Sequence, residues 1–171
     1  MGTVANEPQF RTILDFIETA SREGATLVAG GEPAREGALA KGLFVKPTIF
    51  ADVRNHMRIA QEEIFGPILS IIPFETEEEA IRIGNDTRFG LASGIWTRDL
   101  NRAHRVSRAI HAGMVWVNTY RAAAAQAPFG GVKESGFGRE RGEEGLYEFL
   151  RTKNVMVDFS DESRDPFAIR V

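Results

Sequence analysis

The middle of the sequence alternates strand-like and helix-like segments, and this alternation constrains the fold more than any other feature. Apolar runs predict three strands, at residues 68–74, 91–97 and 114–117. Between them, Thr76 begins a segment with the spacing of a capping box, and Asp99 can cap a second helix. Strands and helices that alternate at this spacing favour parallel pairing through right-handed crossovers, and the first strand is expected to be buried. The predicted fold class is therefore α/β, with a core of parallel strands.

The N-terminal third is predicted to begin with an amphipathic helix over residues 8–22, which Gly24 ends. Its apolar residues recur at helical spacing and share one face: Phe10, Ile13, Leu14 and Ile17. The segments expected to follow are a strand at 26–29, a polar loop at 32–42, strand pieces at 44–45 and 48–50, and a connection at 52–61 with a short extended piece near Ile59.

The C-terminal third combines an irregular segment, a short helix and a late strand. Residues 120–138 read as a long irregular segment with several glycines, and loops of this length in compact domains are usually functional or disordered. A helix is predicted over residues 143–151, with Leu146, Phe149 and Leu150 buried. The alternating residues 154–159 predict a strand whose open edge can pair with another chain.

Composition excludes several classes of function. The chain has 171 residues, of which 43% are hydrophobic, and a net charge of −3, which gives no reason to expect a nucleic-acid or anionic-membrane partner. No apolar run is long enough to cross a bilayer, and residues 1–5 lack the features of a signal peptide, so a cytoplasmic location is expected. The sequence contains no cysteine, which removes disulfides, thiolate metal ligands and any thiol nucleophile.

The familiar motifs of nucleotide, metal and serine chemistry do not fit. The segment from Gly136 to Gly142 is one residue too long for the dinucleotide fingerprint, and no strand immediately precedes it. The three histidines have no spacing that completes a ligand set, so no metal site is expected. No Gly-x-Ser-x-Gly pattern marks a serine nucleophile.

Two carboxylates beside aromatic residues remain as candidates. The stretch from Glu62 to Pro67 places adjacent acids and an aromatic before the first predicted strand, and it reads either as a helix end with an ordinary turn or as a site. A carboxylate can accept two hydrogen bonds from a vicinal diol such as a ribose, and a neighbouring ring offers an apolar face to a heterocycle. Glu140 with Phe129 is the second pair, in which a carboxylate could exchange protons with a base.

Four ordered motifs resemble the C-terminal part of an NAD(P)-dependent aldehyde dehydrogenase. They are residues 62–67, residues 85–91, residues 115–118, and residues 128–136 with 138–140 after them. The resemblance runs from about Val4 to Phe159 in the family's order. It implies that Glu63 holds the hydroxyls of the nicotinamide ribose and that Phe65 packs beside the nicotinamide, with NAD or NADP as the cofactor.

The same resemblance implies a proton path and a substrate tunnel. Glu140 resembles an auxiliary carboxylate that supports the general base, and Phe129 resembles a wall of the tunnel. Arg121 and Ala123 fall where the family lines that tunnel, and an arginine there would favour an anionic aldehyde. The alternative for Arg121 is an ordinary salt bridge at a surface or interface.

The departure from the family is the absence of its cysteine nucleophile. That residue, the base, the oxyanion donor and the dinucleotide-binding domain would all precede Met1, and residues 1–10 resemble an interior segment of such an enzyme. The chain is therefore expected to be about the last third of an aldehyde dehydrogenase, inactive alone and with weak or no cofactor binding. The alternative is a non-catalytic assembly module derived from such an enzyme.

The resemblance also divides the chain into three parts. Residues 1–152 are expected to be the C-terminal portion of the catalytic domain, residues 153–159 an oligomerisation strand, and residues 160–171 a tail. A homo-oligomer that assembles through the strand is the expected state, with an aldehyde as the substrate of the complete enzyme.

Overall fold

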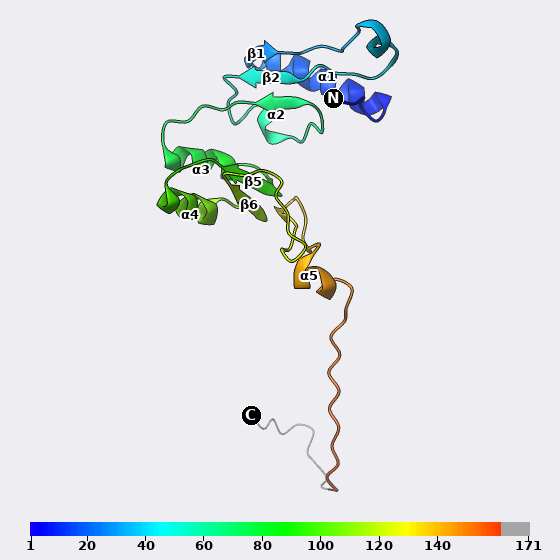
Figure 1. The fold of residues 1–171 in the computed structure, drawn as a ribbon, viewed down its shortest axis with the longest axis vertical. Coiled ribbons are helices and arrows are strands. Elements are labelled where there is room, and N and C mark those ends of the chain that lie inside the picture. Colours follow the sequence, from blue (N-terminus) through cyan, green and yellow to red (C-terminus); the bar gives the residue numbers. More distant parts are fainter. Residues whose placement is uncertain (162–171) are drawn as a thin grey trace.

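The computed structural model describes residues 1–161 and shows an elongated molecule (Figure 1). One end holds the first helix and a small sheet, the middle holds two further helices with a second sheet, and the C-terminal segment leads away from both. The elements of the first end are α1 (Glu7–Arg22), β1 (Thr26–Ala29), the 3-10 helix η1 (Gly37–Lys41), β2 (Thr48–Ala51), α2 (Arg58–Gln61) and β3 (Ile68–Ser70).

Helix α1 forms where the sequence predicts it. The Asn6 side chain accepts a hydrogen bond from the backbone N–H of Gln9 at 2.9 Å, which satisfies one of the free donors at the helix start. Gly24 follows the last turn with a φ of +96°, a conformation that favours glycine. The buried face of α1 packs on the first sheet in a core of Ile13, Ile17, Ala20, Ala25, Val45, Phe50, Val53, Met57 and Ile59.

The first sheet has β2 at its centre. Strand β1 pairs with β2 in antiparallel fashion, and β3 pairs with β2 in parallel fashion, with Thr48 opposite Ile68. The Thr48 side chain is buried, but its hydroxyl accepts a hydrogen bond from the N–H of Gly31 at 2.9 Å and donates one to the carbonyl of Lys46 at 2.8 Å. The buried polar atom is therefore fully partnered.

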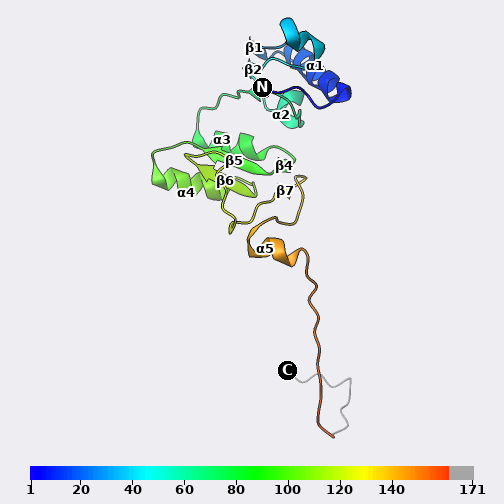
Figure 2. The same ribbon diagram turned by 45° about the vertical axis from the view of Figure 1, so that its right-hand side comes forward.

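The middle of the molecule carries a second parallel pair. Its elements are α3 (Glu77–Asn85), β4 (Phe89–Gly90), β5 (Ala92–Ile95), α4 (Leu100–Ala109), β6 (Met114–Val117), β7 (Val132–Lys133) and α5 (Gly142–Tyr147). Strands β5 and β6 are parallel neighbours, with α4 as the crossover between them (Figure 2). Thr76 and Asp99 both cap their helices as predicted, each accepting from a backbone N–H three residues later. The α/β class is thus confirmed.

A carboxylate on α3 ties that helix to α4. Glu77 lies 2.9 Å from Arg102 Nε and 2.5 Å from Arg105 Nε. Hydrogen bonding from Arg105 is the largest cause that lowers the pKa of Glu77 to about 2, with Arg102 adding to it. The two helices are therefore linked by a charge that stays negative far into the acid range.

The expected single run of parallel strands is wrong in one respect. Strand β3 pairs with β2 of the first sheet and not with β5, so the three predicted strands belong to two sheets. Strand β3 also ends at Ser70, and Leu69 and Ile71 are exposed, so residues 68–74 are not the buried strand that was predicted. The apolar run predicted a long buried strand. Only three of its residues pair with β2.

Three shorter segments also differ from expectation. The connection near Ile59 is the helix α2 and not an extended piece, and the polar loop at 32–42 contains η1. The irregular stretch at 120–138 contains β7, which pairs with β4 in antiparallel fashion. Each is too short for a sequence period to show.

The C-terminal predictions hold least well. Helix α5 exists but is shorter than predicted, and Leu146, Phe149 and Leu150, expected to be buried, are exposed. Residues 154–159 form no strand within the described chain and run out from the body with exposed side chains (Figures 1 and 2). Their pairing with a second chain stays a prediction, and most of the predicted tail lies outside the described residues.

Candidate functional site

The loop from Glu62 to Pro67 lies against α1, which fixes its backbone. Gln9 Nε2, on the first turn of α1, donates hydrogen bonds to the carbonyls of Ile64 at 2.7 Å and Phe65 at 3.2 Å. At Gly66 there is no room for a side chain, because a Cβ would lie 2.7 Å from Cγ1 of Ile13. The loop then leads into β3, and its end is held by the N–H of Thr48 in β2, which donates a hydrogen bond to the carbonyl of Pro67 at 2.9 Å.

Within this loop the candidate side chains face water. Phe65 has a φ of +52°, a left-handed conformation that is uncommon for a bulky residue, and its side chain is 80% exposed. Glu63 is also exposed. An unusual backbone conformation that holds an apolar ring in solvent is a reason to look for a function at this position.

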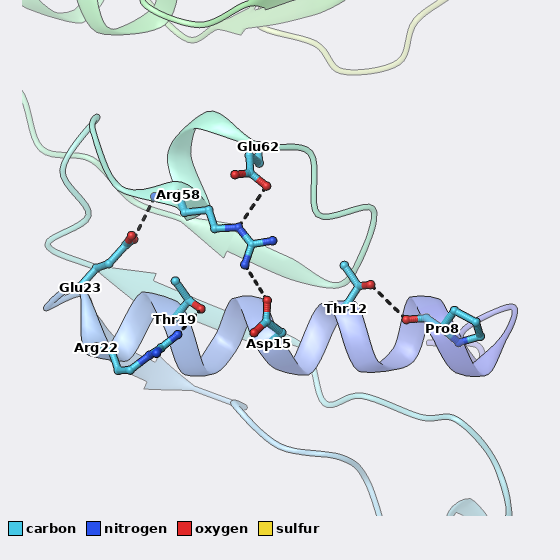
Figure 3. Close-up of polar contacts among 8 residues, drawn as sticks. All are labelled: Pro8, Thr12, Asp15, Thr19, Arg22, Glu23, Arg58 and Glu62. Atoms are coloured by element: carbon cyan, nitrogen blue, oxygen red, sulfur yellow. Dashed lines mark hydrogen bonds and ion pairs between the residues drawn. The ribbon is translucent and has the colours of Figure 1, made fainter.

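The two adjacent acids of the loop have different environments. Glu62 is paired with Arg58 at 3.0 Å (Figure 3). Within the described residues, no hydrogen bond or ion pair engages the Glu63 carboxylate. Glu62 is therefore occupied by the protein itself, and Glu63 is the carboxylate that can accept hydrogen bonds from a ligand.

These residues fit one end of a nicotinamide nucleotide. The free carboxylate of Glu63 can accept both hydroxyls of a ribose, and the exposed ring of Phe65 can cover one face of a heterocycle. The fit is limited to that end, because the arrangement supplies two side chains and no phosphate cradle.

The second candidate pair is joined by the backbone. The N–H of Phe129 donates to the carbonyl of Glu140, and the N–H of Glu140 donates to the carbonyl of Phe129, each at 2.7 Å. Both residues line a hollow of about 360 Å³ together with Leu91, Ser135, Arg139 and Glu148. The structure thus brings Phe129 and Glu140 together as the sequence suggested, with the Glu140 side chain exposed at the surface.

Arg121 and Ala123 lie on an exposed segment that follows β6. Trp116 in β6 holds this segment, because its Nε1 donates to the carbonyl of Ala122 at 2.7 Å and its ring meets the ring of Tyr120 edge to face at 5.6 Å. Arg121 has a φ of +57° between these two anchors. Its exposed side chain forms no ion pair with the described residues, so the salt-bridge alternative gains no support there.

Three polar residues that position these loops were not singled out for a role by sequence reasoning. Asn85 donates through Nδ2 to the carbonyl of Ala109 at 2.8 Å and accepts from the N–H of His111 at 2.7 Å. Lys133 Nζ donates to the Asn85 carbonyl at 2.8 Å. Asn118, just after β6, bonds the N–H and the carbonyl of Thr97 through its amide. For Asn85 and Asn118 the available signal was an amide side chain placed directly at the end of an element, and no such signal marks Lys133.

The arrangement of the candidate groups is divided between the two parts of the molecule. In both views the loop before β3 belongs to the α1 end, whereas the segment between β7 and α5 lies beyond the α3, β5 and β6 layer. Among the described residues, no three potential metal ligands cluster, and no helix is long and apolar enough to cross a membrane.

The α/β fold contains two pairs of parallel strands, β2 with β3 and β5 with β6, and the comparisons with known proteins identify its family. Residues 1–155 match the aldehyde dehydrogenase family, and the chain belongs to that family. It is 48% identical over 162 residues to aminoaldehyde dehydrogenase 1, peroxisomal, of Pisum sativum. The matched residues make up 95% of this chain and 32% of that protein.

Solved structures give the same result. The chain matches a variant of betaine aldehyde dehydrogenase from Staphylococcus aureus with a TM-score of 0.93 and 39% identity, over 98% of this chain and 34% of that one. It matches Mycobacterium tuberculosis aldehyde dehydrogenase complexed with NAD+ with a TM-score of 0.87 and 44% identity, over 95% and 33% of the two chains. The chain thus spans about a third of the length of these relatives.

Proposed function

We propose that this chain supplies the nicotinamide-ribose contact and part of the substrate tunnel of an NAD(P)-dependent aldehyde dehydrogenase. Membership of the family supports aldehyde oxidation as the activity to which the chain contributes. The observation that carries the cofactor role is the contrast within one loop, where Glu62 is paired and Glu63 is exposed and free beside the exposed ring of Phe65. The M. tuberculosis relative was solved with NAD+, which favours this cofactor.

The chemistry of each residue follows from its place. A nicotinamide nucleotide held here would supply the hydride acceptor for the oxidation. Glu63 would orient the ring through its ribose, and Phe65 would shield one ring face from water. Glu140, held to Phe129 by two backbone hydrogen bonds, would pass a proton to or from the general base, and Phe129, Arg121 and Ala123 would line the substrate's path.

We further propose that the 171-residue chain alone does not turn over. Aldehyde dehydrogenases of this kind attack the carbonyl with a thiolate, and this sequence has no cysteine. A serine or carboxylate is a much weaker nucleophile at neutral pH, so no residue here replaces it. Formation of NADH from an aldehyde by rigorously purified chain would overturn this proposal.

The second candidate function is a non-catalytic assembly module. It is favoured by the C-terminal segment, where Val155, Met156, Val157 and Phe159 are exposed on an extended stretch that runs out from the body. Pairing of residues 153–159 with another chain would cover them and would give a homo-oligomer. Deletion of these residues should then turn the oligomer into monomers in analytical ultracentrifugation.

The cofactor role is tested in a complete enzyme. The chain is joined to the remaining N-terminal part of the S. aureus betaine aldehyde dehydrogenase, and Glu63→Gln is compared with Glu18→Gln, an exposed carboxylate of α1. A hydrogen bond to a charged group contributes about 1.5 kcal/mol or more, so Glu63→Gln should raise the KM for NAD about tenfold. Equal KM values for the two variants would refute the assignment.

The cellular compartment of the protein is part of the same proposal. The sequence predicts a cytoplasmic location, whereas the pea relative carries the word peroxisomal in its name. Fluorescence microscopy of the tagged native protein distinguishes the two compartments.

A further inference from the structure

Arg58 occupies the junction between α1 and the loop that carries Glu63. Its Nη1 lies 2.6 Å from Asp15 Oδ2 on α1, and its Nε lies 3.0 Å from Glu62 Oε2 (Figure 3). Its guanidinium also stacks over the buried ring of Phe16, 4.1 Å from the ring centre. The two carboxylates, Asp15 first and then Glu62, raise the pKa of Arg58, so the charge is permanent.

The backbone of Arg58 is held as firmly as its side chain. Its N–H donates to Glu23 Oε2 at 2.9 Å, just past the end of α1, and its carbonyl accepts from the N–H of Glu62 at 3.0 Å. Arg58 therefore bonds to Asp15 within α1 and to Glu23 just past its end, and it bonds to both the side chain and the N–H of Glu62 at the start of the loop. On the far side of Glu63, Gln9 holds the carbonyls of Ile64 and Phe65.

Glu63 thus lies between two anchors, Arg58 of α2 and Gln9 of α1, and Arg58 is itself bound to Asp15 of α1. The anchor before it is the Arg58 link to Glu62, and the anchor after it is the Gln9 link to the next two carbonyls. Since the Glu63 side chain itself is free, its direction depends on the backbone that these anchors hold. The position of α1 therefore determines the direction of the Glu63 carboxylate.

We propose that Arg58 is a positioning residue that uses Glu62 to orient Glu63 toward the cofactor, an inference that rests on the function proposed above. The planar fork of arginine can bond Asp15 and Glu62 at the same time while its face covers Phe16, which the single ammonium of lysine cannot do. The pairing explains why two acids stand together, with Glu62 bound within the protein and Glu63 left for the ligand.

The loop itself is tested by hydrogen exchange on the 171-residue protein, without cofactor. Arg58→Ala and Glu62→Gln should each speed exchange by about three- to tenfold in the peptides that cover residues 60–68, where the amides of Glu62 and Ile68 are hydrogen-bonded. Exposed ion pairs and a stacked arginine each shift an opening equilibrium a few-fold. Arg105→Ala is the matched control, since Arg105 also joins two helices through a carboxylate but lies away from this loop.

Each result of the exchange experiment decides the proposal. Faster exchange confined to residues 60–68, with Arg58→Lys between the wild type and Arg58→Ala, supports it. Unchanged exchange in both variants, or an equal increase throughout the α1 end, overturns it, because the latter would make Arg58 a general stabilising contact. Glu62→Gln keeps the bond between Arg58 and Asp15, so it remains informative if Arg58→Ala fails to fold.

The link to the cofactor is tested in the joined enzyme described above. Arg58→Ala should raise the KM for NAD about fivefold, less than Glu63→Gln, and should leave the KM for the aldehyde unchanged. A rise in both KM values, or in neither, overturns the positioning role. If Glu63→Gln has no effect on the KM for NAD, the proposed function fails, whereas a confined exchange result would still establish Arg58 as the residue that orders the loop.

Discussion

Replacing Gly113 with alanine should destabilise the middle of the molecule, because there is no space for a methyl group. A Cβ at this position would overlap the carbonyl oxygen of Gly130 and would lie 2.8 Å from its carbonyl carbon and 3.1 Å from Cα of Gly131. All three are backbone atoms. They cannot rotate away as a flexible side chain can, so the backbone near Phe129 has to shift.

The size of the effect follows from how little the neighbours can yield. The carbonyl of Gly131 accepts a hydrogen bond from Arg139 at 2.8 Å, and a Cβ at Gly131 would itself lie 2.6 Å from Ser135 Cβ, so the loop is filled on its other side. Overpacking of this kind costs about 1–3 kcal/mol. The lower entropy of the unfolded alanine chain offsets about 0.4–1 kcal/mol of this cost. The difference between these two ranges is about 0–2.6 kcal/mol, and because the clash is with backbone atoms a net loss of about 1–2 kcal/mol is expected.

Urea unfolding followed by tryptophan fluorescence measures this loss of unfolding free energy in the middle of the molecule. Trp96 and Trp116 are the only tryptophans in the sequence; Trp116 lies in β6 of the second sheet, and Trp96 directly follows β5. At an m value of about 2 kcal/mol/M, the urea midpoint should fall by about 0.5–1 M. Gly84→Ala is the control, because it lies within a helix and its Cβ meets only the end of the Ile110 side chain at 3.2 Å. A midpoint for Gly113→Ala at or above that of the wild type would refute the reasoning.

Three further changes give separable outcomes. The folded pKa of Glu77, about 2, lies below its ordinary 4.5, so its ion pairs stabilise the fold above about pH 4.5 and are lost as the pH falls toward 2; urea midpoints across this range should drop less in Glu77→Gln than in the wild type. Thr48→Val leaves two partly buried backbone partners, the N–H of Gly31 and the carbonyl of Lys46, without the hydroxyl and should lower the free energy of unfolding by about 1–2 kcal/mol, whereas Thr3→Val at an exposed site should not. In the joined enzyme, Arg121→Ala should raise the KM for anionic aldehydes selectively, and an equal rise for neutral aldehydes would contradict its role in substrate choice.

The parts of the fold that the sequence predicts are those where local signals and packing agree. For helix α1 the sequence predicts an apolar face and a terminating glycine, and the structure confirms both and adds the Asn6 cap. Helix α2 has only four residues, so no period can show in the sequence, and its place depends on the contacts that Arg58 makes with α1. Strand β3 was assigned to the wrong sheet, because an apolar run indicates burial but carries no information about which strand will pair with it.

The candidate site was predictable to a similar degree. The sequence singles out the loop before β3, but two adjacent acids look alike in a sequence, and only the pairing of Glu62 separates their roles. The spacing of four residues between Arg58 and Glu62 was a readable signal for that pair. The contact of Arg58 with Asp15 joins residues far apart in the chain, and no local pattern could have shown it.

The exposure of the candidate residues argues for the role of this chain as one side of a larger site. A carboxylate in water gains little from a hydrogen bond with a ribose, because water competes for the same acceptor, and an open ring excludes no solvent from a nicotinamide. For the proposed cofactor role, Glu63 and Phe65 would need other residues to enclose them and lower the local dielectric. This chain by itself can fix the direction of the Glu63 side chain, through the bond of Arg58 to α1 and the bonds of Gln9 to the loop. We therefore expect its own binding of NAD to be weak, and the contribution of Glu63 to grow when the remaining part of the site is joined to it.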